Sequence, residues 1–289
     1  MSSWRAPRLR SPISAKVSIP GSKSQTARAL YLAAIGKHPC VIEGVLRSRD
    51  TDLFAQALRT LGAQIDMLGD SRAQITPISS DSPSSERVID CGLAGTVMRF
   101  LPPLAALSPT PTRFDGDEQA YARPLAPLLD VLESLGATLS YHGEKGHLPF
   151  TISGPLKPSS SPITVDASAS SQFFSAMLLV APLIGGAIIQ SNAPLISLPH
   201  IEMTLNMMHE AGLSWTQLGD REWRVDAGAP TASEITIGEG HPTHTPSFEC
   251  GSLLMRGNTQ RRKRHNPQLA AYINPARRTV AVSFRRDRY

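Results

Sequence analysis

The sequence predicts an α/β fold built from three similar units of about 75 residues each. A helical pattern that ends in a glycine occurs three times, with the glycines at positions 62, 136 and 212. A different helical pattern precedes each of these, and a short strand-like stretch opens each unit. Because two kinds of helix repeat in the same phase, we expect duplicated units that pack pseudo-symmetrically around a shared core.

Each element of the unit has its own signal. Alternating apolar and polar residues predict opening strands at 14–19, 86–91 and 161–167. Apolar spacing of i, i+3, i+4 and i+7 predicts first helices at 24–36, 94–107 and 170–186, and second helices at 50–65, 123–139 and 199–215. The glycines suit helix C-terminal caps, and alternating runs follow them. The predicted unit is therefore βαβαββ.

Composition limits the class of protein. With 289 residues, 41% of them apolar, the chain can form a real core, which excludes a wholly disordered protein. No apolar run approaches the roughly 20 residues that a membrane helix needs, and no secretory signal is visible. Three widely spaced cysteines suggest neither a disulfide framework nor a zinc site, so we expect no metal and a reducing cytoplasm.

The net charge of +5 is unevenly distributed. Residues 241–289 hold ten Lys or Arg and two acids, whereas the preceding 240 residues are mildly acidic. We therefore expect an atypical, poorly ordered basic tail over 236–289. Its basic run at 261–265 allows a nucleic-acid contact, but stacking aromatics are sparse there, which favours a solvated tail and no nucleic-acid partner.

The starts of the first helices suggest an anion site. They carry small or hydroxyl residues at 21–24, 93–96 and 170–172. A helix start offers unpaired N–H groups and a positive dipole end, and small residues let an anion approach. Equivalent units would place the three starts on one side and form a site for phosphate or carboxylate groups. The alternative for each start is plain N-capping by Ser or Thr.

Cations lie where such a site needs them. Lys23 is at the first start, and Arg123 is expected to open a second helix. Arg28 and Arg99 interrupt apolar helices, so each needs a partner or a ligand. A planar guanidinium suits bidentate recognition of carboxylate or phosphate.

Five ordered motifs within residues 14–235 resemble the 3-phosphoshikimate 1-carboxyvinyltransferase (EPSP synthase) family, its actinobacterial members above all. They are PGSKSQTARAL (20–30), AGTVMRF (94–100), YARPL (121–125), SSQFFSAMLL (170–179) and SLPHIEMTL (197–205). The resemblance implies an inside-out α/β domain of three units. It also implies transfer of the enolpyruvyl group of phosphoenolpyruvate to shikimate 3-phosphate, in aromatic amino-acid biosynthesis, with no cofactor and no metal.

The resemblance also implies roles for individual residues. Lys23 would contact both substrates and help at the reacting phosphoenolpyruvate, and Ser24 and Arg28 would hold the shikimate ring and its carboxylate. Gly95 would line the phosphoenolpyruvate pocket, where the family is the target of glyphosate, and Arg123 would bind the phosphate of phosphoenolpyruvate. The residues expected at shikimate 3-phosphate are Ser170, Ser171 and Ser197 at its phosphate, and Gln172 at its ring.

Two positions depart from the family pattern. Leu93 stands where many members have Asn, so one polar contact is in question. His200 stands where some members have Tyr near the shikimate phosphate, and a surface histidine at a helix start is an equal interpretation.

The family has two similar domains with the active site between them, and full-length members are expected to be monomeric. We assign residues 1–14 to a segment that pairs with the other domain and residues 15–235 to the three-unit domain. The second domain should begin near Glu234, yet its motifs are not visible after Gly238. The expectation is a truncated or altered C-terminus, for example one translated out of frame.

Two other functions stay open. The first is an inactive half-protein that only binds shikimate 3-phosphate. The second is a UDP-N-acetylglucosamine carboxyvinyltransferase, but that family has Lys-Asn where this chain has Lys23-Ser24, and its catalytic Cys in a Gly-rich loop has no counterpart near Arg123.

Overall fold

The computed structural model describes residues 14–17, 21–79, 86–238, 272–273 and 280–283. The chain divides into two units. One is Lys23–Ile237, and the other joins residues 1–22 to 238–289. In the second unit, β1 (Ser14–Val17) pairs antiparallel with β15 (Val280–Ser283), which pairs with β14 (Tyr272–Ile273). Of the expected basic tail, residues 239–271, 274–279 and 284–289, which include the run at 261–265, lie outside the described residues.

The unit Lys23–Ile237 contains the predicted repeat. The first copy holds α1 (Lys23–Ala34), β2 (Cys40–Glu43), α2 (Arg49–Thr60), β3 (Gln64–Met67) and β4 (Arg72–Thr76). The second holds β5 (Arg87–Asp90), α3 (Gly95–Ala105), β6 (Thr112–Asp115), α4 (Ala126–Ser134), β7 (Thr138–Tyr141) and β8 (Phe150–Ser153). The third holds β9 (Ile163–Thr164), α5 (Ser171–Val180), β10 (Gly186–Gln190), α6 (Leu198–Glu210), β11 (Trp215–Gly219) and β12 (Glu222–Asp226).

Each copy forms one four-stranded sheet of the same topology. The second copy has the order β5-β6-β8-β7 and the third β9-β10-β12-β11, with the opening strand parallel to its neighbour and the other pairs antiparallel. The first sheet has the order β13-β2-β4-β3, so β13 (Glu234–Thr236) takes the opening position.

The first sheet therefore differs from the expectation that the strand at 14–19 would open it. That stretch forms β1, which pairs with β15 instead. β13 lies parallel to β2, with paired residues 193 positions apart in the sequence. Val41 N donates to the Ser233 carbonyl and Ile237 N donates to the Glu43 carbonyl, each at a short distance (2.9 and 2.8 Å). Alternation predicts a strand but not its partner, which explains the difference.

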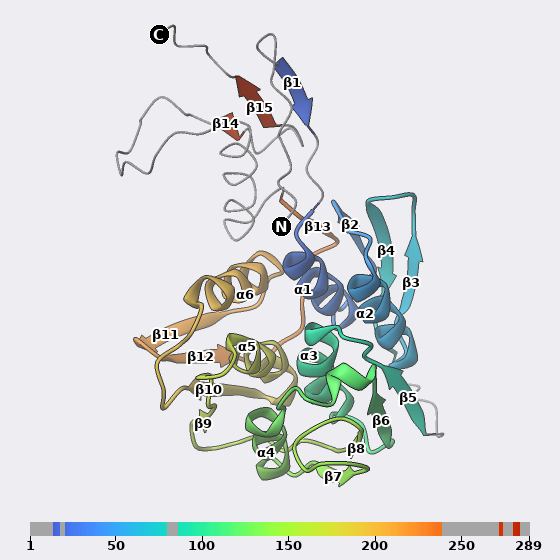
Figure 1. The fold of residues 1–289 in the computed structure, drawn as a ribbon. Helices are drawn as coiled ribbons and strands as arrows, with labels where there is room; N and C mark the ends of the chain where they lie inside the picture. The colour runs from blue at the N-terminus through green and yellow to red at the C-terminus, as the bar shows by residue number, and fades with distance from the viewer. Residues whose placement is uncertain (1–13, 18–20, 80–85, 239–271, 274–279, 284–289) are drawn as a thin grey trace, which may run out of the picture. The chain divides into compact units, whose positions relative to one another are not determined.

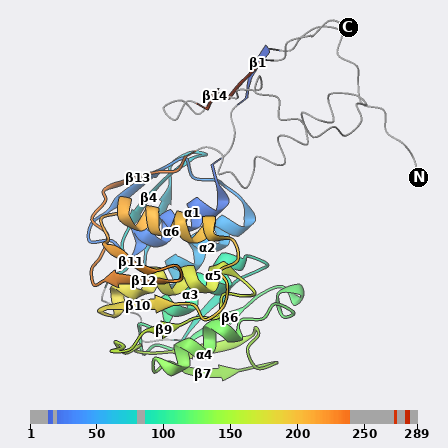
Figure 2. The ribbon, with the colours of Figure 1, turned by 90° about the vertical axis from the view of Figure 1, so that its left-hand side faces the viewer.

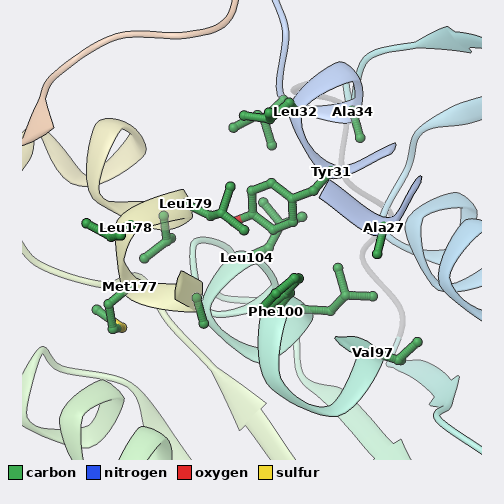
Figure 3. Packing of buried hydrophobic residues seen from close by; sticks show 14 of the residues in the cluster. Ala27, Tyr31, Leu32, Ala34, Val97, Phe100, Leu104, Met177, Leu178 and Leu179 are labelled. Carbon is green, nitrogen blue, oxygen red and sulfur yellow. The ribbon is translucent and has the colours of Figure 1, made fainter. Parts of the chain in front are cut away.

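The first helices of the three repeats, α1, α3 and α5, lie inside, and the sheets lie outside (Figures 1 and 2). Nearly every residue of α1, α3 and α5 is buried, whereas most strands alternate buried and exposed residues. Figure 3 shows Tyr31 of α1 between side chains of α3 and α5, among them Phe100, Leu104 and Leu179. The inside-out arrangement is thus confirmed, and its centre is formed by three helices that are buried over most of their surface.

Several helices are shorter than the apolar pattern predicts. α4 begins at Ala126 because Pro124 and Pro127 lie at its start, so Arg123 belongs to the preceding turn and not to the helix. α5 ends at Val180, where Pro182 leads into a short 3₁₀ helix, Ala181–Ile184. The glycines at 62, 136 and 212 all have positive φ just after a helix end, as predicted.

Two features are absent from the described residues. No helix in that part of the chain is long and apolar enough to cross a membrane. The described side chains also include no cluster of three His, Cys, Asp or Glu that could hold a metal ion.

Candidate functional site

The start of α3 meets the start of α5. Gly95 is the first residue of α3, and a Cβ atom there would lie 2.8 Å from Arg99 Nη1, 3.3 Å from Gln172 Oε1 and 3.7 Å from Arg123 Nη1. Arg99 Nη1 donates to Gln172 Oε1 over 2.8 Å, which joins the two helices. Three polar side chains thus converge on a helix start whose backbone is bare. We call Gly95, Arg99, Arg123 and Gln172 the α3 cluster.

The guanidinium groups of Arg99 and Arg123 both lie next to Gly95, so two positive charges are close together in the α3 cluster. Burial, followed by the charge of Arg123, lowers the pKa of Arg99. The Arg99 guanidinium lies over the ring of Phe173, 5.3 Å from its centroid, and its Nε has no hydrogen-bond partner among the described residues. An anion bound here would neutralise the two close positive charges and accept a hydrogen bond from the unsatisfied donor, so the arrangement favours anion binding. The sequence pattern indicated that Arg99 needs a partner, but the family motifs gave it no role.

Arg123 is held in place by the backbone. Its Nη1 donates to the Leu93 carbonyl over 2.9 Å, and its N–H closes a turn onto the Ala120 carbonyl. The contact that orients Arg123 therefore comes from the main chain at position 93, so Leu93 supplies it as well as Asn would.

Arg28 is fully buried and joins three helices. Its Nε donates to Thr204 Oγ1 over 2.7 Å, and its Nη2 makes longer contacts with Ser175 Oγ (3.4 Å) and the His200 carbonyl (3.2 Å). Its Nη1 donates to the Ser24 carbonyl, and the group lies over the ring of Phe100 at 5.0 Å. Burial lowers the pKa of Arg28 to about 9, which still leaves it charged near neutral pH.

Lys23, in contrast to the fully buried Arg28, is exposed to solvent. Its ammonium pairs with Asp50 on α2 over 2.8 Å, and half of its side chain is exposed. Exposed ion pairs contribute little to stability, so a ligand can replace Asp50 at small cost. Asp50 was not among the predicted site residues, because nothing in the sequence pattern linked α2 to the start of α1.

The serines at the helix starts differ from one another. Ser170 caps α5, since its Oγ accepts from Gln172 N over 3.3 Å, as the plain capping interpretation expects. Ser171 is buried. Ser197 precedes α6 with a positive φ of 59° and makes no side-chain cap hydrogen bond within the described structure; instead its carbonyl accepts from the N–H of His200 over 3.0 Å. His200 contributes its carbonyl, which accepts from Arg28 and Thr204.

The structure thus brings the predicted residues into two groups. Gly95, Arg123 and Gln172 meet in the α3 cluster, with Ser170 beside Gln172. Ser24 and His200 meet around Arg28 through their carbonyls. Lys23 contacts Asp50, and Ser197 stands at the start of α6.

Comparison with known proteins gives a consistent result. The model of the EPSP synthase (3-phosphoshikimate 1-carboxyvinyltransferase) family matches residues 7–249, and so continues past Gly238, after which no family motif was visible. A 3-phosphoshikimate 1-carboxyvinyltransferase of Bifidobacterium longum (strain DJO10A) is 42% identical over 265 residues, covering 89% of this chain. The protein of the same name from Mycobacterium ulcerans (strain Agy99) is 47% identical over 232 residues, covering 78% of this chain. The chain spans 59% and 52% of the lengths of these two relatives.

Solved structures share the fold. An EPSP synthase from Acinetobacter baumannii matches with a TM-score of 0.67 at 23% identity, covering 77% of this chain and 49% of that one. The enolpyruvyl transferase NikO from Streptomyces tendae matches with a TM-score of 0.57 at 18% identity, covering 80% of this chain and 53% of that one.

Proposed function

This chain belongs to the EPSP synthase family, and we propose that it binds shikimate 3-phosphate and phosphoenolpyruvate for the reaction of that family. The reaction transfers the enolpyruvyl group to shikimate 3-phosphate and releases phosphate. The observation that carries the proposal is the α3 cluster, where Arg99, Arg123 and Gln172 surround the bare backbone of Gly95. The names of the relatives favour shikimate 3-phosphate over a UDP-sugar acceptor.

The α3 cluster suits phosphoenolpyruvate. Two guanidinium groups and the N–H groups at the start of α3 can together neutralise its phosphate and carboxylate, which would otherwise repel the second anionic substrate. Gly95 leaves the room that these groups need. Because Gln172 Oε1 accepts from Arg99, the amide nitrogen is the donor end of that side chain, and we assign it to a ring hydroxyl of shikimate 3-phosphate.

We assign the remaining predicted residues to shikimate 3-phosphate. Ser170, Ser171 and Ser197 offer hydroxyl groups to its phosphate, and His200 lies one turn after Ser197 at the start of α6. Ser24 and Arg28 would hold the ring and its carboxylate. Arg28 would reach that carboxylate by exchanging its two longest contacts, those of Nη2 with Ser175 and His200.

The chemistry is addition followed by elimination. A hydroxyl oxygen of shikimate 3-phosphate forms a bond to C2 of phosphoenolpyruvate and loses its proton, while C3 gains one. The tetrahedral intermediate then expels phosphate as C3 returns a proton and the double bond reforms. Lys23 would contact both substrates, exchanging Asp50 for a substrate oxygen. Holding two anions in contact is the main contribution of these residues.

We also infer a reducing, cytoplasmic location. Cys40 and Cys91 are buried free thiols, and burial raises the pKa of Cys40 to about 11. Free thiols of this kind stay reduced in a reducing compartment, where disulfides are rare. Labelling of cell fractions with an antibody to the chain tests the location.

Phosphate release by the 289-residue chain, supplied with both substrates, tests the proposed function. Release that needs both substrates supports the transferase. Calorimetric binding of shikimate 3-phosphate without phosphate release would support the binding-only alternative, and neither binding nor release would overturn the proposal. Arg123→Met should weaken phosphoenolpyruvate binding or use at least tenfold, whereas Arg224→Met, an exposed arginine on β12, should leave both unchanged.

A further inference from the structure

A cavity of about 560 Å³ lies at the other end of the interior helices. Its walls come from all three repeats: Ala34 and Leu61 from the first, Arg87, Leu104 and Leu107 from the second, and Leu183 from the third. α1 ends at Ala34 and α3 at Ala105, so this is the C-terminal end of both helices (Figure 3 labels Ala34 and Leu104). The 11 residues of α3 place it about 16 Å from the α3 cluster.

Arg87 is the unusual residue of this cavity. It begins β5, whose residues alternate buried and exposed, and it occupies an inward-facing position where an apolar residue is the rule. Only 6% of it is exposed. Among the described residues, its Nε and Nη2 have no hydrogen-bond partner. A buried guanidinium that lacks an acceptor lowers the stability of the fold. A role in binding a ligand therefore explains an arginine at this position better than a structural role does.

The surroundings define the class of ligand. Leu61, Leu104, Leu107 and Leu183 give the cavity an apolar wall, and its volume falls in the range of small-molecule sites. Nearby helix ends carry negative dipole charge, which disfavours a dianion such as phosphate but tolerates one negative charge opposite Arg87. Burial lowers the pKa of Arg87, and a bound anion would reverse that shift.

We propose that this cavity, which we call the Arg87 pocket, binds a small monocarboxylate with an apolar body, with the carboxylate on Arg87 and the body against the leucine wall. The pocket is separate from the α3 cluster and does not depend on the proposed function. A planar carboxylate can accept from two adjacent N–H donors of a guanidinium at once. Phosphate can do the same, but its desolvation in this pocket would cost more free energy.

Isothermal titration of the 289-residue chain with 3-phenylpropanoate tests the proposal. We expect one site, and binding at least tenfold weaker for the neutral isostere 3-phenylpropanamide and for acetate, which lacks the apolar body. Inorganic phosphate should not compete. Equal binding of the acid and the amide, or no binding of the acid at millimolar concentration, would overturn the proposal.

Two variants and one control locate the site. Arg87→Met should reduce binding of 3-phenylpropanoate at least tenfold. It should melt at or above the wild-type temperature, because two buried donors that lack an acceptor among the described residues are removed. Leu107→Trp, which fills the pocket from a half-buried position, should block binding while Arg87 remains. Arg224→Met should bind as the wild type does. Wild-type affinity in Arg87→Met would assign the ligand to another place, and shikimate 3-phosphate binding should be unchanged in every variant.

Discussion

Arg28 and Tyr31 lie close together on α1 and are both fully buried, but their polar atoms have opposite environments. Arg28 donates to side chains or carbonyls of α1, α5 and α6, so its burial is compensated. The hydroxyl of Tyr31 has no hydrogen-bond partner among the described residues, and burial raises its pKa. The ring of Tyr31 therefore stabilises the core while its oxygen opposes burial.

Tyr31→Phe should raise the free energy of unfolding by about 1 kcal/mol, because it removes a desolvated hydroxyl and keeps the ring. Urea unfolding measures the change. Tyr121→Phe is the control, since the Tyr121 hydroxyl donates to Asp115 over 2.7 Å and its loss should lower stability. A loss of stability in Tyr31→Phe would mean that the buried hydroxyl has an acceptor.

Gly95→Ala tests the crowded start of α3. The new Cβ would meet the flexible end of Arg99, which can shift, so stability should be nearly unchanged. The Arg99–Gln172 hydrogen bond would be displaced, and KM for phosphoenolpyruvate should rise about tenfold on loss of one charge-assisted contact. Steady-state kinetics measure both substrates. Gly228→Ala, whose nearest atom would be 3.7 Å away, is the control, and an unchanged KM in Gly95→Ala would separate the α3 cluster from this substrate.

At the scale of elements, the second helix of each repeat ends in the same way. A glycine with φ between 90° and 109° follows α2, α4 and α6, and reverses the chain into the next strand. L residues rarely adopt such φ values, so the glycine at this position is a physical requirement of the repeat. That requirement made the repeat visible in the sequence.

Gly62→Ala and Gly212→Ala separate backbone strain from crowding. At Gly62 the nearest atom to a new Cβ lies 3.6 Å away, so only the positive φ opposes the change, at about 1 kcal/mol. At Gly212 the Cβ would lie 2.5 Å from Thr231 Oγ1, so we expect a cost about 1 kcal/mol larger. Thermal or urea unfolding gives both values, and equal losses would contradict the crowding argument.

Helix boundaries show where local pattern fails. Apolar periodicity continues through residues 123–125 and 181–184, but prolines at 124 and 182 remove backbone donors and change the conformation there. By contrast α3 continues through Pro102 and Pro103, which lie within a fully packed helix. Tertiary packing decides between these outcomes, and a single sequence does not display it.

At the scale of the whole unit, the end of the chain segment Lys23–Ile237 completes the sheet near its beginning. Ile237 is almost fully buried, and its N–H donates to the Glu43 carbonyl. Ile237→Ala should therefore lower the free energy of unfolding by about 2–5 kcal/mol, like other truncations in a core. Ile196→Ala, at a position that is 50% exposed, should have little effect. Comparable small losses in both variants would show that β13 does not contribute to the core.

Much of the fold could be predicted because the repeat restricts it. Two helices and four strands in a fixed phase, three times over, indicate similar units packed around a shared core, and the family resemblance added that the helices lie inside. The pairing of β13 with β2 could not be predicted, because alternation in Glu234–Thr236 says nothing about a partner 193 residues earlier. For the candidate site, motifs located the helix starts, but the Arg99–Gln172 contact joins residues 73 positions apart and depends on packing of α3 against α5.

The late arrival of β13 also affects how the chain is made. A ribosome that adds about 5–20 residues per second needs roughly 10–40 s to extend the nascent polypeptide from β2 to β13. Throughout that interval one edge of β2 has exposed backbone donors and acceptors, which can pair with a neighbouring nascent chain. Slower translation or scarce chaperones should therefore favour aggregation before the closing strand emerges.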